Sequence, residues 1–123
     1  MPSELPVVFT NGFFDNISAG HLKFLDQLKI LKGFNVVGIN SDNSIDEQKG
    51  ALPLINEHER ALLLSTVEAV DRVVIFNELD AGSMIRLIRP QIVVKGERFL
   101  NKKMPEEKAI EETGAKLKFF PEY

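Results

Sequence analysis

The sequence predicts an α/β protein in which helices cover both faces of a five-stranded parallel sheet. Short apolar runs rich in Val and Ile read as buried strands, because strands covered on both faces need no polar alternation. These runs alternate along the chain with segments of helical spacing, the order typical of right-handed β-α-β units. Since no linker, repeat or low-complexity tract interrupts them, we expect residues 1–123 to form one three-layer α/β/α domain.

The first three expected elements are a strand, a helix and a strand. Residues 5–10 are apolar and β-branched up to an Asn-Gly pair, which favours a tight loop. Leucines recur at steps of three over residues 20–31, which predicts an amphipathic helix, and Gly33 is expected to end it. Residues 35–39 form the second apolar strand.

Two helices and a strand are expected in the middle of the chain. Residues 44–49 suit a short helix after the polar stretch 40–44, whose side chains can cap it. Residues 57–67 show helical spacing, whereas residues 51–56 contain a proline and are expected to be irregular. Residues 72–76 read as the third buried strand.

The last third of the chain continues the alternation. Residues 83–88 are expected to be helical until a proline ends the helix, and residues 91–94 form a fourth apolar strand. Residues 105–113 open with a proline and two acids, as helix first turns do, and stop before a glycine. Residues 116–120 complete the sheet as its fifth strand.

Composition and charge argue against several classes of protein. The chain carries 15 Lys and Arg against 18 Asp and Glu, a net charge of −3, which argues against a nucleic-acid coat or a polybasic membrane binder. Cysteine is absent, which removes disulfides, thiolate metal sites and cysteine nucleophiles and suits a reducing compartment. No apolar stretch approaches the roughly 20 residues that span a bilayer. We therefore expect a cytoplasmic protein without a nucleic-acid or membrane partner.

The loop between the first strand and the first helix has the features of an anion site. Ligands of parallel α/β sheets bind beyond the carboxyl ends of the strands, an edge that residues 10–21, 40–49 and 95–98 would share. Gly20 and His21 fall in the first turn of a helix, where free backbone N–H groups and the positive helix end favour phosphate. A lone histidine at this position is also compatible with a solvated surface residue.

The same loop carries a recognisable signature. It matches neither the Walker A pattern nor Gly-x-Gly-x-x-Gly. Instead GFFDNISAGH resembles the Gly-x-Phe-Asp-x-x-His-x-Gly-His motif of the cytidylyltransferase-like nucleotidyltransferases. Later blocks look like those of the bacterial heptose 1-phosphate adenylyltransferases and fit the glycerol-3-phosphate cytidylyltransferases less well. In order they are Asn40-Ser41-Asp42, Lys49-Gly50, Asn56-Glu57-His58-Glu59-Arg60, Val70-Asp71-Arg72-Val73-Val74 and Val94-Lys95-Gly96.

The resemblance implies a Rossmann-like fold of the nucleotidyltransferase type and a chemical activity. In such enzymes a phosphate oxygen of a phosphorylated sugar or polyol attacks the α-phosphate of ATP or CTP, and pyrophosphate leaves. The protein mainly aligns the phosphates and neutralises their charge, and Mg²⁺ accompanies the triphosphate. By resemblance, the partners are a nucleoside triphosphate and a phosphorylated small-molecule acceptor, and the chain forms a homodimer.

The resemblance also implies which residues form the site. The catalytic candidates are His21, Lys49 and Ser18. The nucleotide-binding candidates are Thr10, Asn11, Gly12, Phe13, Phe14, Gly20, His21, Lys95 and Gly96. The candidates for binding substrate phosphate are Asp42, Lys49 and Arg60, and no protein residue is assigned as a metal ligand.

Several of these residues also have a structural interpretation. Lys49 can be a solvated loop lysine, and Arg60 can form an ion pair with Asp42 or Glu57. Asp15 reads mainly as a cap. Three further acids are expected only to begin helices, without a chemical role: Asp80, Glu106 and Glu107.

Two departures from the family pattern leave a second function open. Ser18 stands where the motif has its first histidine, so a group that can carry charge becomes a hydroxyl that gives one neutral hydrogen bond. Family members continue past the fifth strand into a Ser/Thr-rich phosphate-binding block and the usual C-terminal helix, which this sequence lacks. The alternative is a catalytically weak or inactive nucleotide-binding or scaffold module of the same fold. A flavodoxin-like protein with an unrelated ligand would leave the matching blocks unexplained.

Overall fold

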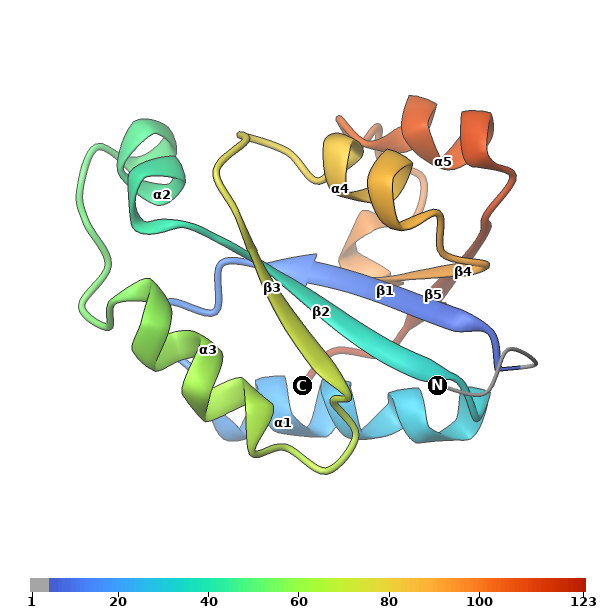
Figure 1. The fold of residues 1–123 in the computed structure, drawn as a ribbon, viewed down its shortest axis with the longest axis horizontal. Coiled ribbons are helices and arrows are strands. Elements are labelled where there is room, and N and C mark those ends of the chain that lie inside the picture. Colours follow the sequence, from blue (N-terminus) through green and yellow to red (C-terminus); the bar gives the residue numbers. More distant parts are fainter. Residues whose placement is uncertain (1–4) are drawn as a thin grey trace.

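Over the part of the chain that the structure describes, five parallel strands form the centre of the protein, in the order β3-β2-β1-β4-β5. This arrangement is seen in a computed structural model that describes residues 5–123, so the first four residues of the predicted domain lie outside the described range. Helices cover both faces of the sheet (Figure 1). The predicted Rossmann-like α/β fold is therefore confirmed. Over residues 5–123, none of the helices is long and apolar enough to cross a membrane.

The strands lie close to the predicted apolar runs. They are β1 (Val7–Gly12), β2 (Phe34–Asn40), β3 (Arg72–Phe76), β4 (Ile92–Gly96) and β5 (Lys116–Phe120). Strands β3 and β5 have the predicted bounds. Strand β1 was predicted to stop before Asn11, but Asn11 pairs with Gly38 and Gly12 pairs with Ile39, so sheet pairing outweighs the local turn preference of Asn-Gly.

The helices also follow the predicted alternation. They are α1 (Ala19–Asp26), α2 (Asp42–Lys49), α3 (Glu57–Ser65), α4 (Gly82–Ile88) and α5 (Glu107–Thr113), with 3₁₀ turns η1 (Gln27–Leu31) and η2 (Glu97–Phe99). The predicted helix 20–31 is thus an α-helix followed by a 3₁₀ turn. Lys32, with φ of 52°, takes the left-handed position expected of Gly33.

Caps explain where two helices begin. The Ser41 side chain accepts a hydrogen bond from the Ser44 N–H at 3.1 Å, so α2 starts before the predicted residue 44. The Asn56 side chain accepts from the Glu59 N–H at 2.9 Å and begins α3 at the predicted position.

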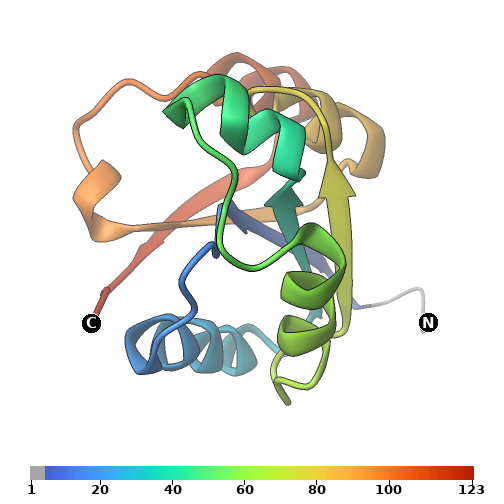
Figure 2. The same ribbon diagram turned by 90° about the vertical axis from the view of Figure 1, so that its left-hand side faces the viewer.

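Each face of the sheet has its own apolar core. Figure 2 shows α1 and α3 on one side of the sheet and α2, α4 and α5 on the other. Leu25, Leu28 and Leu64 pack under the first face. Ala81, Ile85 and Ile110 pack over the second. Because both faces are covered, the central strands bury apolar side chains on both faces, as the sequence indicates.

The strand order reverses between β1 and β4. The chain builds β1, β2 and β3 outward in one direction and then returns to place β4 and β5 on the other side of β1. The pairing of β1 with β4 covers only Val8 with Ile92 and Phe9 with Val93. Beyond these pairs the two strands separate toward their carboxyl ends, which is where parallel α/β sheets bind ligands.

Candidate active site

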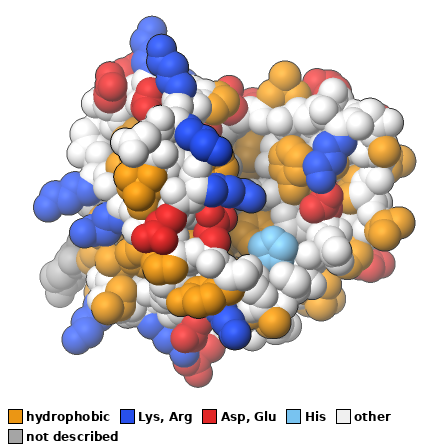
Figure 3. Space-filling view, turned by 180° about the vertical axis from the view of Figure 1, so that it is seen from behind, with side chains coloured by type: hydrophobic (Ala, Val, Ile, Leu, Met, Phe, Trp, Pro, Cys, Tyr) orange, Lys and Arg blue, Asp and Glu red, His pale blue; other side chains and the backbone are white. Residues whose placement is uncertain are grey.

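A cavity of about 720 Å³ opens at the carboxyl ends of β1 and β4. It is walled by the loop after β1, the start of α1, the end of α2, the segment around η2 and the last two residues. Figure 3 shows this hollowed face, with hydrophobic side chains inside the hollow and charged side chains and a histidine beside it. The volume is in the range of small-molecule sites.

The structure brings most of the predicted site residues together around this cavity. Its lining includes Thr10, Asn11, Gly12, Phe13, Phe14, Ser18, Gly20, His21, Lys49, Lys95 and Gly96. Asp42 and Arg60 are not part of the lining. Parallel topology predicts that residues 10–21, 40–49 and 95–98 share one edge of the sheet. The cavity lies at that edge, and the lining residues from these three segments meet there.

His21 is held at the N-terminus of α1 by the residue that caps this helix. The Ser18 backbone N–H donates to His21 Nδ1 at 3.0 Å, and Ser18 Oγ lies 3.1 Å from the same nitrogen. Since Nδ1 accepts a hydrogen bond, the neutral ring carries its proton on Nε2. His21 thus keeps one N–H donor beyond its cap contacts, at the positive end of a helix.

Phe14 supports the ring of His21. Their ring centroids are 5.3 Å apart. Phe14 has a φ of 49°, a left-handed conformation that costs a non-glycine residue on the order of 1 kcal/mol. Strained backbone conformations of this kind cluster at functional sites.

Lys49 reaches across the cavity from the C-terminal end of α2. Its Nζ lies 2.7 Å from Asp15 Oδ2 and 4.9 Å from the centre of the Phe13 ring. The hydrogen bond from Lys49 lowers the pKa of Asp15 below its usual value. Asp15, interpreted from sequence as a cap, is instead the counter-ion of Lys49. The half-exposed ammonium can exchange this carboxylate for a phosphate.

Lys95, Asn11 and Glu106 join β1, β4 and the segment before α5. Lys95 Nζ donates to Asn11 Oδ1 at 2.6 Å and pairs with Glu106 Oε1 at 2.5 Å. Both charged side chains are nearly buried, at 5% and 7% exposure. Glu106 stands at the start of α5, as the sequence predicts, and it is in addition the counter-ion of Lys95, a contact that was not predicted. Lys95 is distant from Glu106 in the sequence. The one sequence feature that could have indicated this ion pair is a lysine in an apolar strand, because a buried lysine needs a counter-ion.

The segment after β5 forms a further wall of the cavity. The Arg98 backbone N–H donates to Glu122 Oε1 at 3.1 Å, and Arg98 Nε lies 3.3 Å from Glu122 Oε2. The Glu122 carboxylate packs on Gly96, and the Tyr123 carbonyl packs on Gly20, so closely that a Cβ at either glycine would collide with them. None of the three residues Arg98, Glu122 and Tyr123 was among the predicted site residues.

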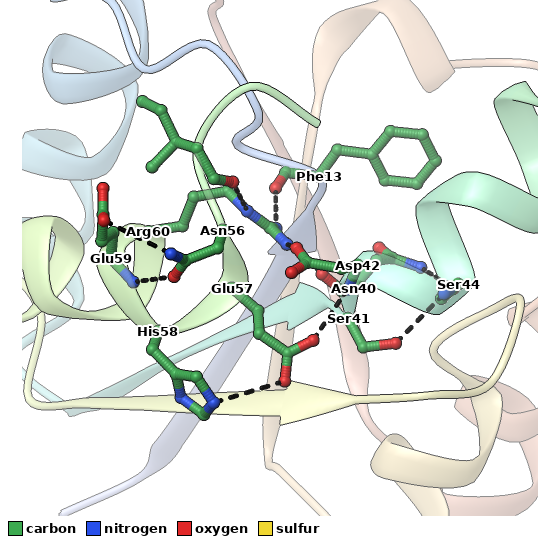
Figure 4. Close-up of polar contacts among 11 residues, drawn as sticks. Phe13, Asn40, Ser41, Asp42, Ser44, Asn56, Glu57, His58, Glu59 and Arg60 are labelled. Atoms are coloured by element: carbon green, nitrogen blue, oxygen red, sulfur yellow. Dashed lines mark hydrogen bonds and ion pairs between the residues drawn. The ribbon is translucent and has the colours of Figure 1, made fainter. Parts of the chain in front are cut away.

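Arg60 does not reach the cavity. Its side chain is fully buried, and Figure 4 shows it among backbone carbonyls and carboxylates. Nη1 donates to Phe13 O at 2.7 Å and to Asn40 O at 2.9 Å, Nε donates to Ile55 O at 3.0 Å, and Nη2 donates to Asp42 Oδ1 at 2.7 Å.

This geometry corrects the prediction that Arg60 and Asp42 bind substrate phosphate. A guanidinium enclosed by four protein acceptors has little left to offer a ligand. The structural interpretation that the sequence also allowed, an ion pair of Arg60 with Asp42, is the one observed. Arg60 instead ties the loop after β1, the end of β2 and the start of α2 together.

The carboxylates of the cavity do not form a preformed metal cage. Within residues 5–123, no three His, Asp or Glu side chains lie close enough together to hold a metal ion. Asp15, Glu106 and Glu122 each pair with a lysine or arginine. Mg²⁺ commonly keeps several waters and binds through substrate phosphates.

Comparison with known proteins identifies the family. A family model described as cytidylyltransferase-like matches residues 9–122. The chain belongs to this cytidylyltransferase-like family, as the motif after β1 predicts.

Individual relatives agree with this assignment. The bifunctional protein HldE of Helicobacter pylori J99 is 43% identical over 112 residues, which make up 90% of this chain and 24% of that protein. HldE of Wolinella succinogenes is 46% identical over 91 residues, 73% of this chain and 19% of that protein. The chain thus spans less than a quarter of the length of these two relatives. The predicted resemblance to the cytidylyltransferase-like family is therefore confirmed.

A solved structure has the same fold over almost its whole length. The lipopolysaccharide core biosynthesis protein from Thermoplasma volcanium GSS1 superposes with a TM-score of 0.78 and 25% sequence identity. The match covers 97% of this chain and 98% of that one.

Proposed function

We propose that this protein transfers a nucleoside monophosphate from ATP or CTP to a phosphorylated sugar or polyol and releases pyrophosphate. The observation that carries the proposal is His21, whose ring is fixed by Ser18 so that the Nε2–H remains as a donor at a helix N-terminus in the cavity. Membership of the cytidylyltransferase-like family supports the reaction class.

The chemistry follows from what these residues can do. An oxygen of the acceptor phosphate forms a bond to the α-phosphorus, and the bond from that phosphorus to the bridging oxygen of pyrophosphate breaks. His21 donates a hydrogen bond to phosphate oxygens as negative charge builds up on them, and the α1 N-terminus adds its partial positive charge. Lys49 leaves Asp15 to neutralise phosphate from the opposite wall. Magnesium bound to the triphosphate would neutralise part of its charge.

The loop and strand ends supply the rest of the proposed nucleotide site. Gly12, Gly20, Lys95 and Gly96 are further proposed nucleotide contacts, Gly12 and Gly20 for phosphate and the backbone of Lys95 and Gly96 for the base. The Tyr123 carbonyl now covers Gly20 and the Glu122 carboxylate covers Gly96, so these two contacts require the last two residues to move aside. Thr10, Asn11, Phe13 and Phe14 complete this set of proposed nucleotide contacts. The homodimer stays a prediction, which sedimentation of the chain would test.

Pyrophosphate release tests the proposed reaction. ATP and CTP are each combined with aldose 1-phosphates and polyol phosphates in the presence of Mg²⁺. The block-by-block resemblance to heptose 1-phosphate adenylyltransferases makes ATP with an aldose 1-phosphate the first pair to test. Pyrophosphate that depends on both substrates supports the proposal, whereas no turnover with any pair, in protein shown to be folded, contradicts it.

Ser18 favours a second candidate function, a nucleotide-binding module with little or no turnover. In place of a side chain that can carry charge, the site has a hydroxyl that already contacts His21. Calorimetric titration with ATP and CTP separates the two functions. Binding without turnover supports the second, and absence of binding argues against both.

Replacing Ser18 with His is expected to raise turnover by about 10²-fold, because one oxyanion donor is worth 10² to 10³ in rate in comparable sites. The Ser18 hydroxyl contacts His21 Nδ1 and accepts no backbone N–H of α1, so the same change should alter stability little. Pyrophosphate release and thermal unfolding measure the two effects. A stable Ser18→His protein whose turnover does not rise would show that Ser18 does not limit the reaction.

A further inference from the structure

A buried ionic cluster spans the gap where β1 and β4 separate. Lys95 lies at the end of β4, Asn11 at the end of β1, and Glu106 just before α5. All three line the cavity. Burying a charge is costly unless it is paired, so a buried lysine and glutamate at a ligand site need an explanation beyond packing.

The cluster fixes the side-chain amide of Asn11. The Lys95 ammonium can only donate hydrogen bonds, so the oxygen of the Asn11 amide faces it. The Nδ2 group of Asn11 then points the other way, and within residues 5–123 no protein acceptor takes its hydrogens. Asn11 is thereby presented as a donor at the cavity, beside the Lys95–Glu106 ion pair.

We propose that Glu106 is a positioning residue for nucleotide binding, which acts by keeping Lys95 protonated and in place against Asn11. The proposal deepens the proposed function and rests on it. The ligand that fits this arrangement is the nucleoside triphosphate of the proposed function, because the cluster presents hydrogen-bond donors while Glu106 balances the charge of Lys95. The proposal depends on the contact of Glu106 with Lys95. It does not depend on the position of Glu106 at the N-terminus of α5.

The charges around Lys95 explain why Glu106 is needed. Burial lowers the pKa of the Lys95 ammonium, and the Glu106 carboxylate opposes this shift. Arg98, in η2, lowers the pKa of Lys95 further, whereas Asp80, before α4, raises it. If Glu106 is neutralised, burial and Arg98 are opposed only by Asp80, so Lys95 loses its proton at a lower pH.

The test compares Glu106→Gln with the intact protein in titrations with ATP and with CTP between about pH 6 and about pH 9. We expect affinity in Glu106→Gln to fall by about tenfold or more at neutral pH, and the deficit to grow as pH rises. Glu106→Asp should restore part of the affinity. Glu107→Gln, which makes the same charge change one residue away, should bind like the intact protein.

A second readout needs no nucleotide. The NMR resonances of the Asn11 side-chain amide and of the Lys95 side chain should report a lower titration midpoint for Lys95 in Glu106→Gln. If removal of Glu106 prevents folding, the double variant Lys95→Met with Glu106→Gln replaces the buried pair by uncharged side chains of similar size and should fold. It should bind nucleotide weakly at every pH.

The outcomes separate the two proposals. Equal affinity of Glu106→Gln and the intact protein at all pH values overturns the positioning role, and so does a pH-independent loss that follows only a drop in Tm. An unchanged Lys95 titration midpoint also overturns it. If the intact protein binds neither ATP nor CTP, the proposed function fails and the nucleotide part of this inference fails with it, whereas the NMR result still decides whether Glu106 holds the Lys95 proton.

Discussion

Replacing Arg60 with Ala is expected to lower the free energy of unfolding by about 3–5 kcal/mol, the cost of breaking a buried ion pair by removing one partner. The guanidinium is fully buried and donates to three backbone carbonyls and to Asp42. Without it these acceptors lose their partners and a cavity remains. Equilibrium unfolding in urea, followed by circular dichroism, measures the loss.

Arg60→Lys separates the contribution of the guanidinium hydrogen bonds from that of the positive charge. A lysine ammonium keeps the positive charge but cannot reach acceptors on several sides at once, so we expect a loss of about 2 kcal/mol. Arg72→Lys, at an exposed position on β3, is the matched control and should be close to neutral. If Arg60→Lys proved as stable as the intact protein, the guanidinium hydrogen bonds of Arg60 would not be what holds the loop after β1, the end of β2 and the start of α2 together.

The role of Arg60 also connects stability with the site. One of its acceptors is the carbonyl of Phe13, in the loop that carries the motif, and another is the carbonyl of Asn40, at the cavity edge of β2. Loss of these bonds frees the loop that positions Phe14 and His21. Variants of Arg60 should therefore lose nucleotide affinity without having removed any group that contacts the ligand.

The sequence pattern predicted the fold because most helices and strands begin and end at residues whose own preferences set those bounds. Strands 72–76 and 116–120 were predicted with their observed bounds, since each is a short apolar or alternating run between polar residues. The end of β1 was not, because the pairing of Asn11 and Gly12 with β2 depends on a strand that is distant in sequence. Lys32 likewise takes a left-handed conformation that local preference assigns to glycine.

In the candidate site too, the residues of a continuous motif were predicted, whereas contacts between distant residues were not. The loop after β1 was predicted because its motif is continuous and because parallel topology gathers strand ends at one edge. The contacts of Glu106 with Lys95 and of Arg60 with the carbonyl of Phe13 were not predicted, because these partners are distant in the sequence. A side chain's charge is visible in sequence, whereas whether it faces solvent, ligand or a buried partner is decided only by packing.

Replacing His21 with Asn is expected to lower turnover by about 10²- to 10³-fold while leaving the protein folded. The Asn side-chain oxygen can still accept the Ser18 N–H that His21 Nδ1 accepts at 3.0 Å, so the start of α1 keeps its cap. The donor at Nε2 has no counterpart in the shorter amide. The substitution thus removes the proposed phosphate contact and retains the structural one. Pyrophosphate release gives kcat and KM, and thermal unfolding gives Tm.

His58→Asn is the matched control, because His58 is the other of the two histidines. It lies on α3 with a side chain that is 84% exposed. It should change neither kcat nor Tm appreciably. Loss of kcat in His21→Asn at unchanged Tm, with His58→Asn unaffected, assigns the effect to the missing Nε2 donor, since an interaction made in the transition state appears in kcat. Equal turnover of the two variants would leave His21 with only its capping role, and phosphate stabilisation would then have to come from Lys49 and the α1 N-terminus.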